Sequence, residues 1–198
     1  MEIIPGVHRF KAPLRGSTLA YINIYLLEGP AGSLLIDTGW KEAGVWEDLL
    51  SQFAAAGVKA EDITDVVVTH VHPDHCGLAS EFKRLSGARI VMHALEEDLL
   101  RARYDDTGPL LDYLGVWLTE HGVTGPELPG IQYAFKSMIK HVIPTQHADR
   151  EVADGEVVSN GAFDLQVVLT PGHAPGHICL YEPGEKLLFA GDHVLPHI

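Results

Sequence analysis

The sequence predicts a single domain of the mixed α/β class. Its 198 residues suit one ordinary domain, and 46% of them are hydrophobic against 21% charged, which is typical of a folded globular chain. Short β-prone runs alternate with helical patterns, and several of the runs end in loops that carry histidine. The twelve histidines of the chain direct attention to those loops.

Three short strands and one helix are expected in the first third of the chain. The strands are separated by turn-forming Gly and Pro, and they are expected at residues 7–11, 21–28 and 33–36. Asp37-Thr38-Gly39 closes the third strand. A helix over residues 42–55 follows, because its apolar residues recur at helical spacing, and Gly57 is placed to end it.

The next third begins with a buried strand over residues 65–69, whose unbroken apolar run DVVVT is typical of a strand covered on both faces. A helix over 78–85 and a strand over 89–92 follow. Residues 94–147 are then expected to form a helical insertion near the active site, with helices at 94–104, 110–121 and 131–141. Strands return at 163–169, 178–182 and 186–190.

Composition excludes several functional classes. The 14 basic and 27 acidic residues give a net charge of −13, which disfavours binding to a nucleic-acid backbone. No apolar run reaches the roughly 18 residues that a membrane span requires, and no secretory signal is visible at the N-terminus. Two cysteines form no disulfide framework. We therefore expect a cytoplasmic protein with a small-molecule substrate and without nucleic-acid or membrane partners.

The strongest motif is the cluster His70-Val71-His72-Pro73-Asp74-His75, directly after the buried strand. In an extended segment His70 and His72 point to the same side, so both imidazoles can meet one cation. Pro73 then bends the chain, and Asp74 and His75 can face the same cavity from the next helical turn. This density of imidazole and carboxylate groups predicts a metal site.

Two further loops carry residues of the same kind. Gly172-His173 follows the expected strand at 163–169, and Gly191-Asp192 follows the strand at 186–190. Ligands from separate strand ends can gather at one edge of a sheet, where binding sites are common.

This ordered set resembles the metallo-β-lactamase-fold hydrolases, whose pattern is HxHxDH followed by a distant histidine, aspartate and histidine. The resemblance covers nearly the whole chain, and the loop from Thr170 to His177 is most similar to the hydroxyacylglutathione hydrolase group. It implies an αββα sandwich, in which two sheets pack face to face with helices outside, and a dinuclear metal site at one edge.

The resemblance also implies a role for each matching residue. His70, His72 and His173 would hold the first metal ion, Asp74 and His75 would hold the second, and Asp192 would bridge both. Asp74 is in addition the expected catalytic residue. A hydroxide shared by two divalent cations would attack a polarised carbonyl carbon. Zinc is the leading expectation for both ions, with iron and manganese as alternatives.

The family pattern ends with a histidine well downstream of the bridging aspartate. In this chain His193 and His197 lie too close to Asp192 to replace it, and the sequence stops at Ile198. A C-terminally truncated domain, one fragment of a longer protein, is therefore expected. An uncovered C-terminal edge would favour association, so a homo-oligomer is expected as well.

Hydrolysis of an ester-like bond, in a thioester, ester or lactone, is the function that this resemblance favours. Two other activities that would use similar metal-ligand residues stay open. One is a persulfide dioxygenase with a single iron, and the other is an endoribonuclease. The ribonuclease would need a local basic channel that the overall charge of −13 does not suggest. A chain that binds one metal without catalysis is a further alternative.

Several other residues have two interpretations. Asp37 either orients a metal-bound histidine or simply forms a turn. His177 and His93 are expected to be structural, hydrogen-bonded histidines, and the acidic runs at 96–98 and 105–106 are expected to be solvated. The aromatic residues of the insertion either pack together or cover the site; they are Tyr104, Tyr113, Trp117, Tyr133 and Phe135.

Overall fold

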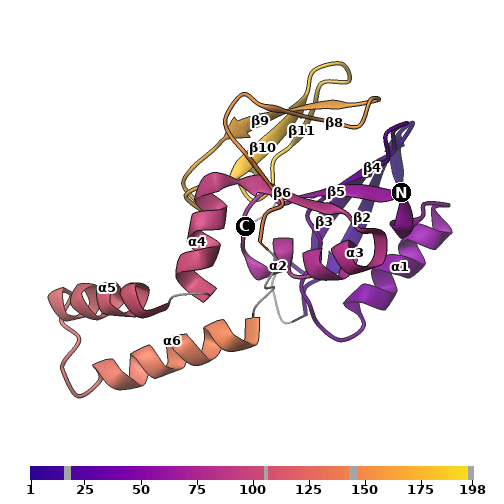
Figure 1. The fold of residues 1–198 in the computed structure, drawn as a ribbon. Coiled ribbons are helices and arrows are strands. Elements are labelled where there is room, and N and C mark those ends of the chain that lie inside the picture. The colour runs from indigo at the N-terminus through magenta and orange to yellow at the C-terminus, as the bar shows by residue number, and fades with distance from the viewer. Residues whose placement is uncertain (16–18, 105–106, 143–146, 196–198) are drawn as a thin grey trace.

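A computed structural model describes residues 1–15, 19–104, 107–142 and 147–195 (Figure 1). Strands β1 to β7 form one sheet in chain order, and the remaining strands form a second sheet in the order β11-β10-β9-β8. The two sheets face each other across an apolar core, and helices α1 and α3 lie on the outer side of the larger sheet (Figure 1). This is the two-sheet α/β architecture that the sequence resemblance implied.

The larger sheet changes from antiparallel to parallel at its centre. Its strands are β1 (Glu2–Ile4), β2 (Val7–Pro13), β3 (Tyr21–Leu27), β4 (Ser33–Ile36), β5 (Ile63–Val67), β6 (Arg89–His93) and β7 (Arg150–Val152). Neighbours from β1 to β4 are antiparallel, whereas neighbours from β4 to β7 are parallel. The carboxyl ends of β4, β5 and β6 therefore meet at one edge, where their loops can share a site.

The smaller sheet is antiparallel throughout. Its strands are β8 (Val157–Ser159), β9 (Asp164–Leu169), β10 (Ile178–Glu182) and β11 (Leu187–Phe189). Because β10 runs against both of its neighbours, β9 and β11 end on the same side of the sheet. The two loops that follow these strands therefore lie together.

Helices occupy the connections of the larger sheet. They are α1 (Val45–Ala55), α2 (Pro73–Cys76), α3 (Ala79–Ser86), α4 (Ala94–Tyr104), α5 (Thr107–Glu120) and α6 (Leu128–Val142), with a 3₁₀ turn, η1, at Ala60–Asp62. Helix α1 buries Val45, Leu49 and Phe53, which recur every four residues along one face. Phe53 packs between Phe10 of β2 and Phe82 of α3, with ring centroids 4.4 and 5.9 Å away.

Strand β4 is apolar at nearly every position because it lies between two cores. Leu35 contributes to the core beneath the helices, whereas Leu34 and Ile36 contribute to the core between the two sheets. Successive side chains of a strand point to opposite faces, so a central parallel strand needs apolar residues on both.

Most predicted elements are present, with shifted ends. The strand expected at 65–69 is Ile63–Val67, because Val68 and Thr69 leave the ladder to enter the functional loop. The strands β1, β7 and β8 were not predicted, since three residues each are too few to show an alternating pattern.

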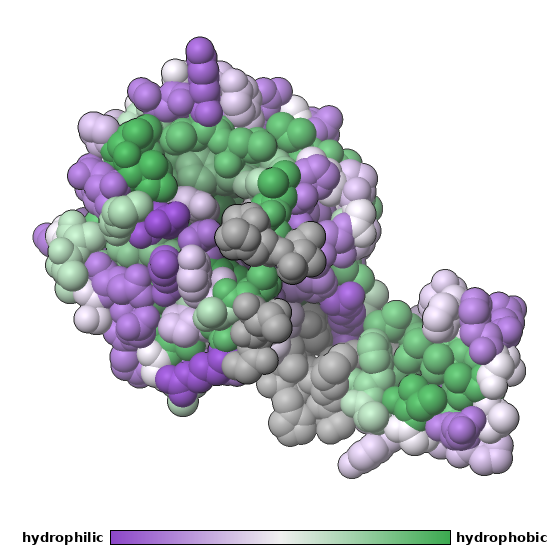
Figure 2. All heavy atoms as spheres, turned by 180° about the vertical axis from the view of Figure 1, so that it is seen from behind, coloured by the Kyte–Doolittle hydropathy of each residue, from purple (hydrophilic) through white to green (hydrophobic). Residues whose placement is uncertain are grey.

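Helices α5 and α6 extend away from the two sheets, beyond α4 (Figure 1). Figure 2 shows apolar side chains gathered on this projecting part. The exposed apolar residues there include Tyr113, Val116, Trp117, Ile131 and Tyr133. Of the two interpretations of the aromatic residues in the insertion, packing together or covering the site, the second finds no support in these side chains. The side chain of Tyr104 lies outside the described ones, as do residues 105–106. Within the described ranges, no helix is long and apolar enough to cross a membrane.

Candidate metal centre

Four strand ends bring the predicted site residues to one edge of the molecule. Asp37 follows β4, and the cluster from His70 to His75 follows β5. His173 and Asp192 follow β9 and β11 in the facing sheet. Residues separated by more than 100 positions thus meet because both sheets end their functional strands at the same edge.

The first group consists of three imidazole nitrogens. His70 Nε2 lies 3.0 Å from His72 Nδ1 and 3.2 Å from His173 Nε2, and the latter two nitrogens are 2.8 Å apart. His70 is fully buried, whereas the side chain of His173 is 38% exposed. The group therefore opens to solvent on the His173 side. We call these three residues the histidine group.

The second group combines one imidazole with carboxylates. His75 Nε2 lies 3.2 Å from Asp192 Oδ1 and 3.7 Å from Asp74 Oδ2. The other oxygen of Asp192 lies 3.3 Å from His173 Nε2, so this carboxylate touches both groups. Asp74 reaches His75 but is less tightly gathered than Asp192, which lies with His70 and His75 within one ligand-sized cluster. We call His75, Asp74 and Asp192 the carboxylate group.

Asp37 sets the orientation of two histidines. Its carboxylate accepts a hydrogen bond from His75 Nδ1 at 2.8 Å and others from the backbone N–H and hydroxyl of Thr69 at 2.9 Å. Thr69 Oγ1 also lies 3.1 Å from His70 Nδ1. With the hydroxyl proton directed to Asp37, Thr69 accepts a hydrogen bond from His70 Nδ1. Both rings are therefore held through Nδ1 and direct Nε2 toward the other ligand-type atoms.

Of the two interpretations of Asp37, these hydrogen bonds favour the orientation of histidines over a simple turn. Asp37 is 3% exposed and has a φ of 60°, a left-handed conformation that Asp tolerates better than most residues. Thr69 was not predicted as part of the site. Its position between the buried strand and His70 is the only sequence signal that could have indicated it.

The two groups differ in their proton affinities. Burial and the neighbouring imidazoles lower the pKa of His70, and burial followed by His173 lowers the pKa of His72. Burial also opposes protonation of His75, but the negative charges of Asp37, Asp192 and Asp74 outweigh it and raise its pKa to about 10. Burial acts against ionisation of Asp192, yet contact with His75 keeps its pKa below the usual range.

His177 supports the loop that carries Asp192. It is fully buried, its Nδ1 lies 2.8 Å from Thr170 Oγ1, and its Nε2 accepts a hydrogen bond from the backbone N–H of Asp192 at 3.1 Å. Gly191 lies so close that an added Cβ would come within 2.6 Å of His177 Nε2. The predicted structural role of His177 therefore fits its contacts, and glycine is required before Asp192.

The expected solvated face at residues 96–98 is wrong for two of its three residues. Glu96 and Glu97 are 0% and 1% exposed, and only Asp98 faces solvent. Both buried carboxylates accept hydrogen bonds from backbone N–H groups far away in the sequence. The charged run EED gave no sign of burial, because the partners that satisfy these carboxylates come from other loops.

The other histidines whose side chains the structure describes, and both cysteines, lie outside the two groups. His93 Nδ1 accepts a hydrogen bond from Leu95 N at 3.1 Å, in keeping with the expected hydrogen-bonded role. His193 is exposed, and His197 lies outside the described residues. Cys76 and Cys179 are buried free thiols, as expected for core positions.

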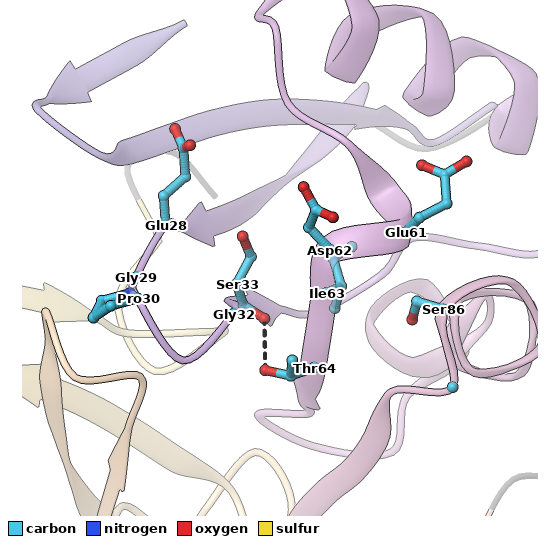
Figure 3. A pocket seen from close by; sticks show the side chains of 11 residues that line it. Glu28, Gly29, Pro30, Gly32, Ser33, Glu61, Asp62, Ile63, Thr64 and Ser86 are labelled. Atoms are coloured by element: carbon cyan, nitrogen blue, oxygen red, sulfur yellow. Dashed lines mark hydrogen bonds between the residues drawn. The ribbon is translucent and has the colours of Figure 1, made fainter.

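A cavity of about 740 Å³ adjoins the carboxylate group. Asp37, His75 and Asp192 form one part of its wall, and the rest is largely apolar side chains from the region of β3 and β11, among them Tyr25 and Phe189. A second hollow, of about 560 Å³, lies where β4 and β5 begin, at the opposite ends of these strands from the site. Figure 3 shows the acidic side chains of Glu28, Glu61 and Asp62 in its lining, and no histidine is among the lining residues.

Two relatives that are both named as thioesterases match most of the chain. Acyl-coenzyme A thioesterase MBLAC2 of Bos taurus is 33% identical over 175 residues, which cover 86% of this chain and 57% of the relative. Atrochrysone carboxyl ACP thioesterase of Aspergillus fumigatus is 29% identical over 88% of this chain and 40% of the relative. The chain thus spans about half the length of these proteins.

The architecture has counterparts among solved structures. The metallo-beta-lactamase family protein TTHA1429 of Thermus thermophilus matches with a TM-score of 0.80 and 28% identity, over 99% of this chain and 62% of that one. The sequence pattern of the metallo-beta-lactamase superfamily matches residues 17–198, which include both groups of ligand-type side chains. The fold class predicted from the sequence is confirmed, and the chain belongs to the metallo-beta-lactamase superfamily.

Proposed function

We propose that this chain carries the catalytic centre of a metal-dependent hydrolase for ester-like bonds, and that it prefers thioesters to esters and lactones. The observation that carries the proposal is the convergence of the histidine and carboxylate groups around the shared carboxylate of Asp192. The two thioesterase relatives favour a thioester over an ester or a lactone.

The residues present fit a pair of divalent cations. A tetrahedral zinc ion with Zn–N bonds of about 2.0–2.1 Å sets its ligand nitrogens roughly 3.3 Å apart, close to the spacing within the histidine group. His75 Nε2 is buried without a hydrogen bond from any described residue and points to Asp192. His70, His72 and His173 would hold one cation, and His75, Asp74 and Asp192 the other. Imidazole and carboxylate ligands accept zinc, iron or manganese, and zinc is our proposal.

Divalent cations bound there supply an activated water and polarise the substrate carbonyl. Asp37 directs the Nε2 atoms of His70 and His75 toward the cations by fixing the opposite ring nitrogens. It accepts a hydrogen bond from His75 Nδ1, and it accepts one from the Thr69 hydroxyl, which itself accepts from His70 Nδ1. Asp74, 19% exposed at the side chain, is the carboxylate that we propose takes the proton of the attacking water. When the carbonyl–sulfur bond breaks, that proton passes to the departing thiolate, and an acid and a thiol are released.

The cavity between the sheets supports a substrate with an apolar acyl part. It lies against Asp37, His75 and Asp192, and Tyr25 and Phe189 provide aromatic surface within it. A small-molecule thioester could therefore place its carbonyl at the metal centre and its acyl chain between the sheets. Rates that rise along a series of acyl-CoA substrates of increasing chain length would agree with this placement.

Metal content and thioester turnover test the proposal together. Elemental analysis of protein purified without added metal should give about two zinc or manganese ions per chain, and zinc-loaded protein should release thiol from acyl-CoA. The release should stop when a chelator is added. Loaded protein that releases no thiol and hydrolyses neither a nitrophenyl ester nor a homoserine lactone would contradict the proposal. One iron per chain with oxygen uptake on a persulfide would favour the dioxygenase instead.

A further inference from the structure

Glu96 connects the two loops that carry the histidine group. Its Oε2 accepts a hydrogen bond from Val71 N, and its Oε1 accepts one from Gly176 N, both at 2.7 Å. Val71 lies between His70 and His72, and Gly176 lies three residues after His173. One carboxylate therefore holds both ligand loops, which come from facing sheets and are about 100 residues apart in sequence.

The surroundings of Glu96 make this contact stiff. Glu96 is fully buried, and it stands in the first turn of α4, where the helix dipole favours a negative charge. A Cβ on Gly176 would come within 2.8 Å of Glu96 N and 2.9 Å of Glu96 Cγ. The 170–177 loop therefore approaches α4 so closely that only glycine fits at position 176. A loop packed in this way cannot shift without breaking the bond to Glu96 or moving α4.

The three imidazoles depend on the distance between these loops. His72 and His173 are in contact through ring nitrogens 2.8 Å apart. Besides Glu96, a backbone hydrogen bond of 3.0 Å from Ile178 N to Thr69 O joins the two loops, but it lies on the far side of His70 from His72. We propose that Glu96 is a positioning residue that sets the distance between His72 and His173 and so raises the cation affinity of the histidine group. This inference rests on the proposed metal site, and it adds a residue that bears no ligand atom for the cation.

Glu97 provides a matched control on the same turn of α4. It is equally buried, and it accepts hydrogen bonds from Ala148 N at 2.9 Å and His147 Nδ1 at 2.8 Å. It also forms an ion pair with Arg101. These contacts tie α4 to the segment before β7 and leave the ligand loops untouched. Glu97→Gln therefore removes a buried charge of the same kind without loosening the histidine group.

Zinc affinity, measured by competition with a chromophoric chelator, separates the two glutamates. Glu96→Gln keeps the shape but replaces one of its two acceptors by an N–H₂ group, so the affinity of the first zinc should fall roughly 10- to 100-fold. Glu96→Asp, which is too short to reach both amides, should give an intermediate loss. Glu97→Gln should stay within about threefold of the wild-type protein. Wild-type affinity in Glu96→Gln, or an equal loss in Glu97→Gln, would overturn the inference.

Hydrogen exchange of the metal-free protein tests the same contact without zinc. The amide protons of Val71 and Gly176 should be protected in the wild-type protein and in Glu97→Gln. At least one of the two should exchange about tenfold faster or more in Glu96→Gln, whose side chain keeps one acceptor oxygen in place of two. A wild-type chain that binds no zinc but shows this exchange pattern would overturn the proposed function and keep the connecting role of Glu96. Unchanged exchange in Glu96→Gln would overturn the connecting role itself.

Discussion

The histidine group and the carboxylate group lie side by side at one edge of the sheets, yet they prepare for a cation in opposite ways. In the histidine group the pKa values of His70 and His72 are lowered, and the group opens to solvent at His173. The carboxylate group keeps His75 buried among Asp37, Asp74 and Asp192, which raise the pKa of His75 to about 10.

This difference indicates how each group is held together without a cation. In the histidine group, nitrogen atoms face one another and the backbone around them is fixed by Glu96. In the carboxylate group, a protonated His75 forms ion pairs with the acids around it. A metal ion would therefore fill the first group directly, but it would have to displace a proton from the second.

Asp192→Asn should produce the largest change, because Asp192 is the residue that touches both groups. Loss of its charge should release the cation of the carboxylate group and weaken the other, with thioester turnover falling at least about 100-fold. Elemental analysis and thiol release measure the two effects. Full retention of both metals would show that Asp192 is not shared.

His72→Ala tests the histidine group alone. Removing one of three imidazoles should abolish zinc binding there and reduce turnover by about 100-fold or more, while the His75–Asp192 contact is untouched. The measurement is metal content per chain at a fixed free zinc concentration. If His72→Ala emptied both groups, the distinction between them would be wrong.

Asp37→Asn should have a smaller effect, through orientation rather than ligation. The asparagine side chain carries no negative charge and has one acceptor oxygen in place of two, so it cannot hold both His75 Nδ1 and Thr69 as Asp37 does. Zinc affinity should therefore fall about 10- to 100-fold. The loss should be larger in the carboxylate group, because His75 contacts Asp37 directly while His70 does so through Thr69. Stepwise zinc titration resolves the two affinities; equal losses would contradict this order.

The number of protons released when a metal ion binds should differ between the two groups. At pH 8 a His75 with a pKa of about 10 is protonated, so a cation entering the carboxylate group should release about one proton. His70 and His72, with lowered pKa values, are already neutral and should release none. Calorimetry in two buffers of different ionisation enthalpy counts these protons. Affinity of the carboxylate group should therefore rise with pH between about 7 and 9.

His193→Ala should change little, and it is the test with the smallest expected effect. His193 is exposed, its ring centroid is 6.2 Å from that of His177, and it belongs to neither group. Zinc affinity and turnover should stay within about twofold of wild type, as for most surface substitutions. A loss of one metal equivalent would instead make His193 a ligand.

The ligand-type residues could be predicted because their signal is local. His70, His72, Asp74 and His75 stand within six positions of one another after a strand that is recognisable from its apolar run. Glu96 and Thr69 could not be predicted in the same way. Their importance depends on partners that arrive from other strands, and their residue types have ordinary local explanations.

The sequence by itself determined the class of fold, the order of the main elements and the chemistry of the clustered side chains, because periodicity and residue type act over a few neighbouring positions. The tertiary structure decided which of these side chains meet. Asp192 joins His75 and His173, and Asp37 serves two histidines, only because β4, β5, β9 and β11 end at one edge of two facing sheets. It also decided that Glu96 is buried, since a charge can leave solvent only where folding brings it two backbone N–H groups.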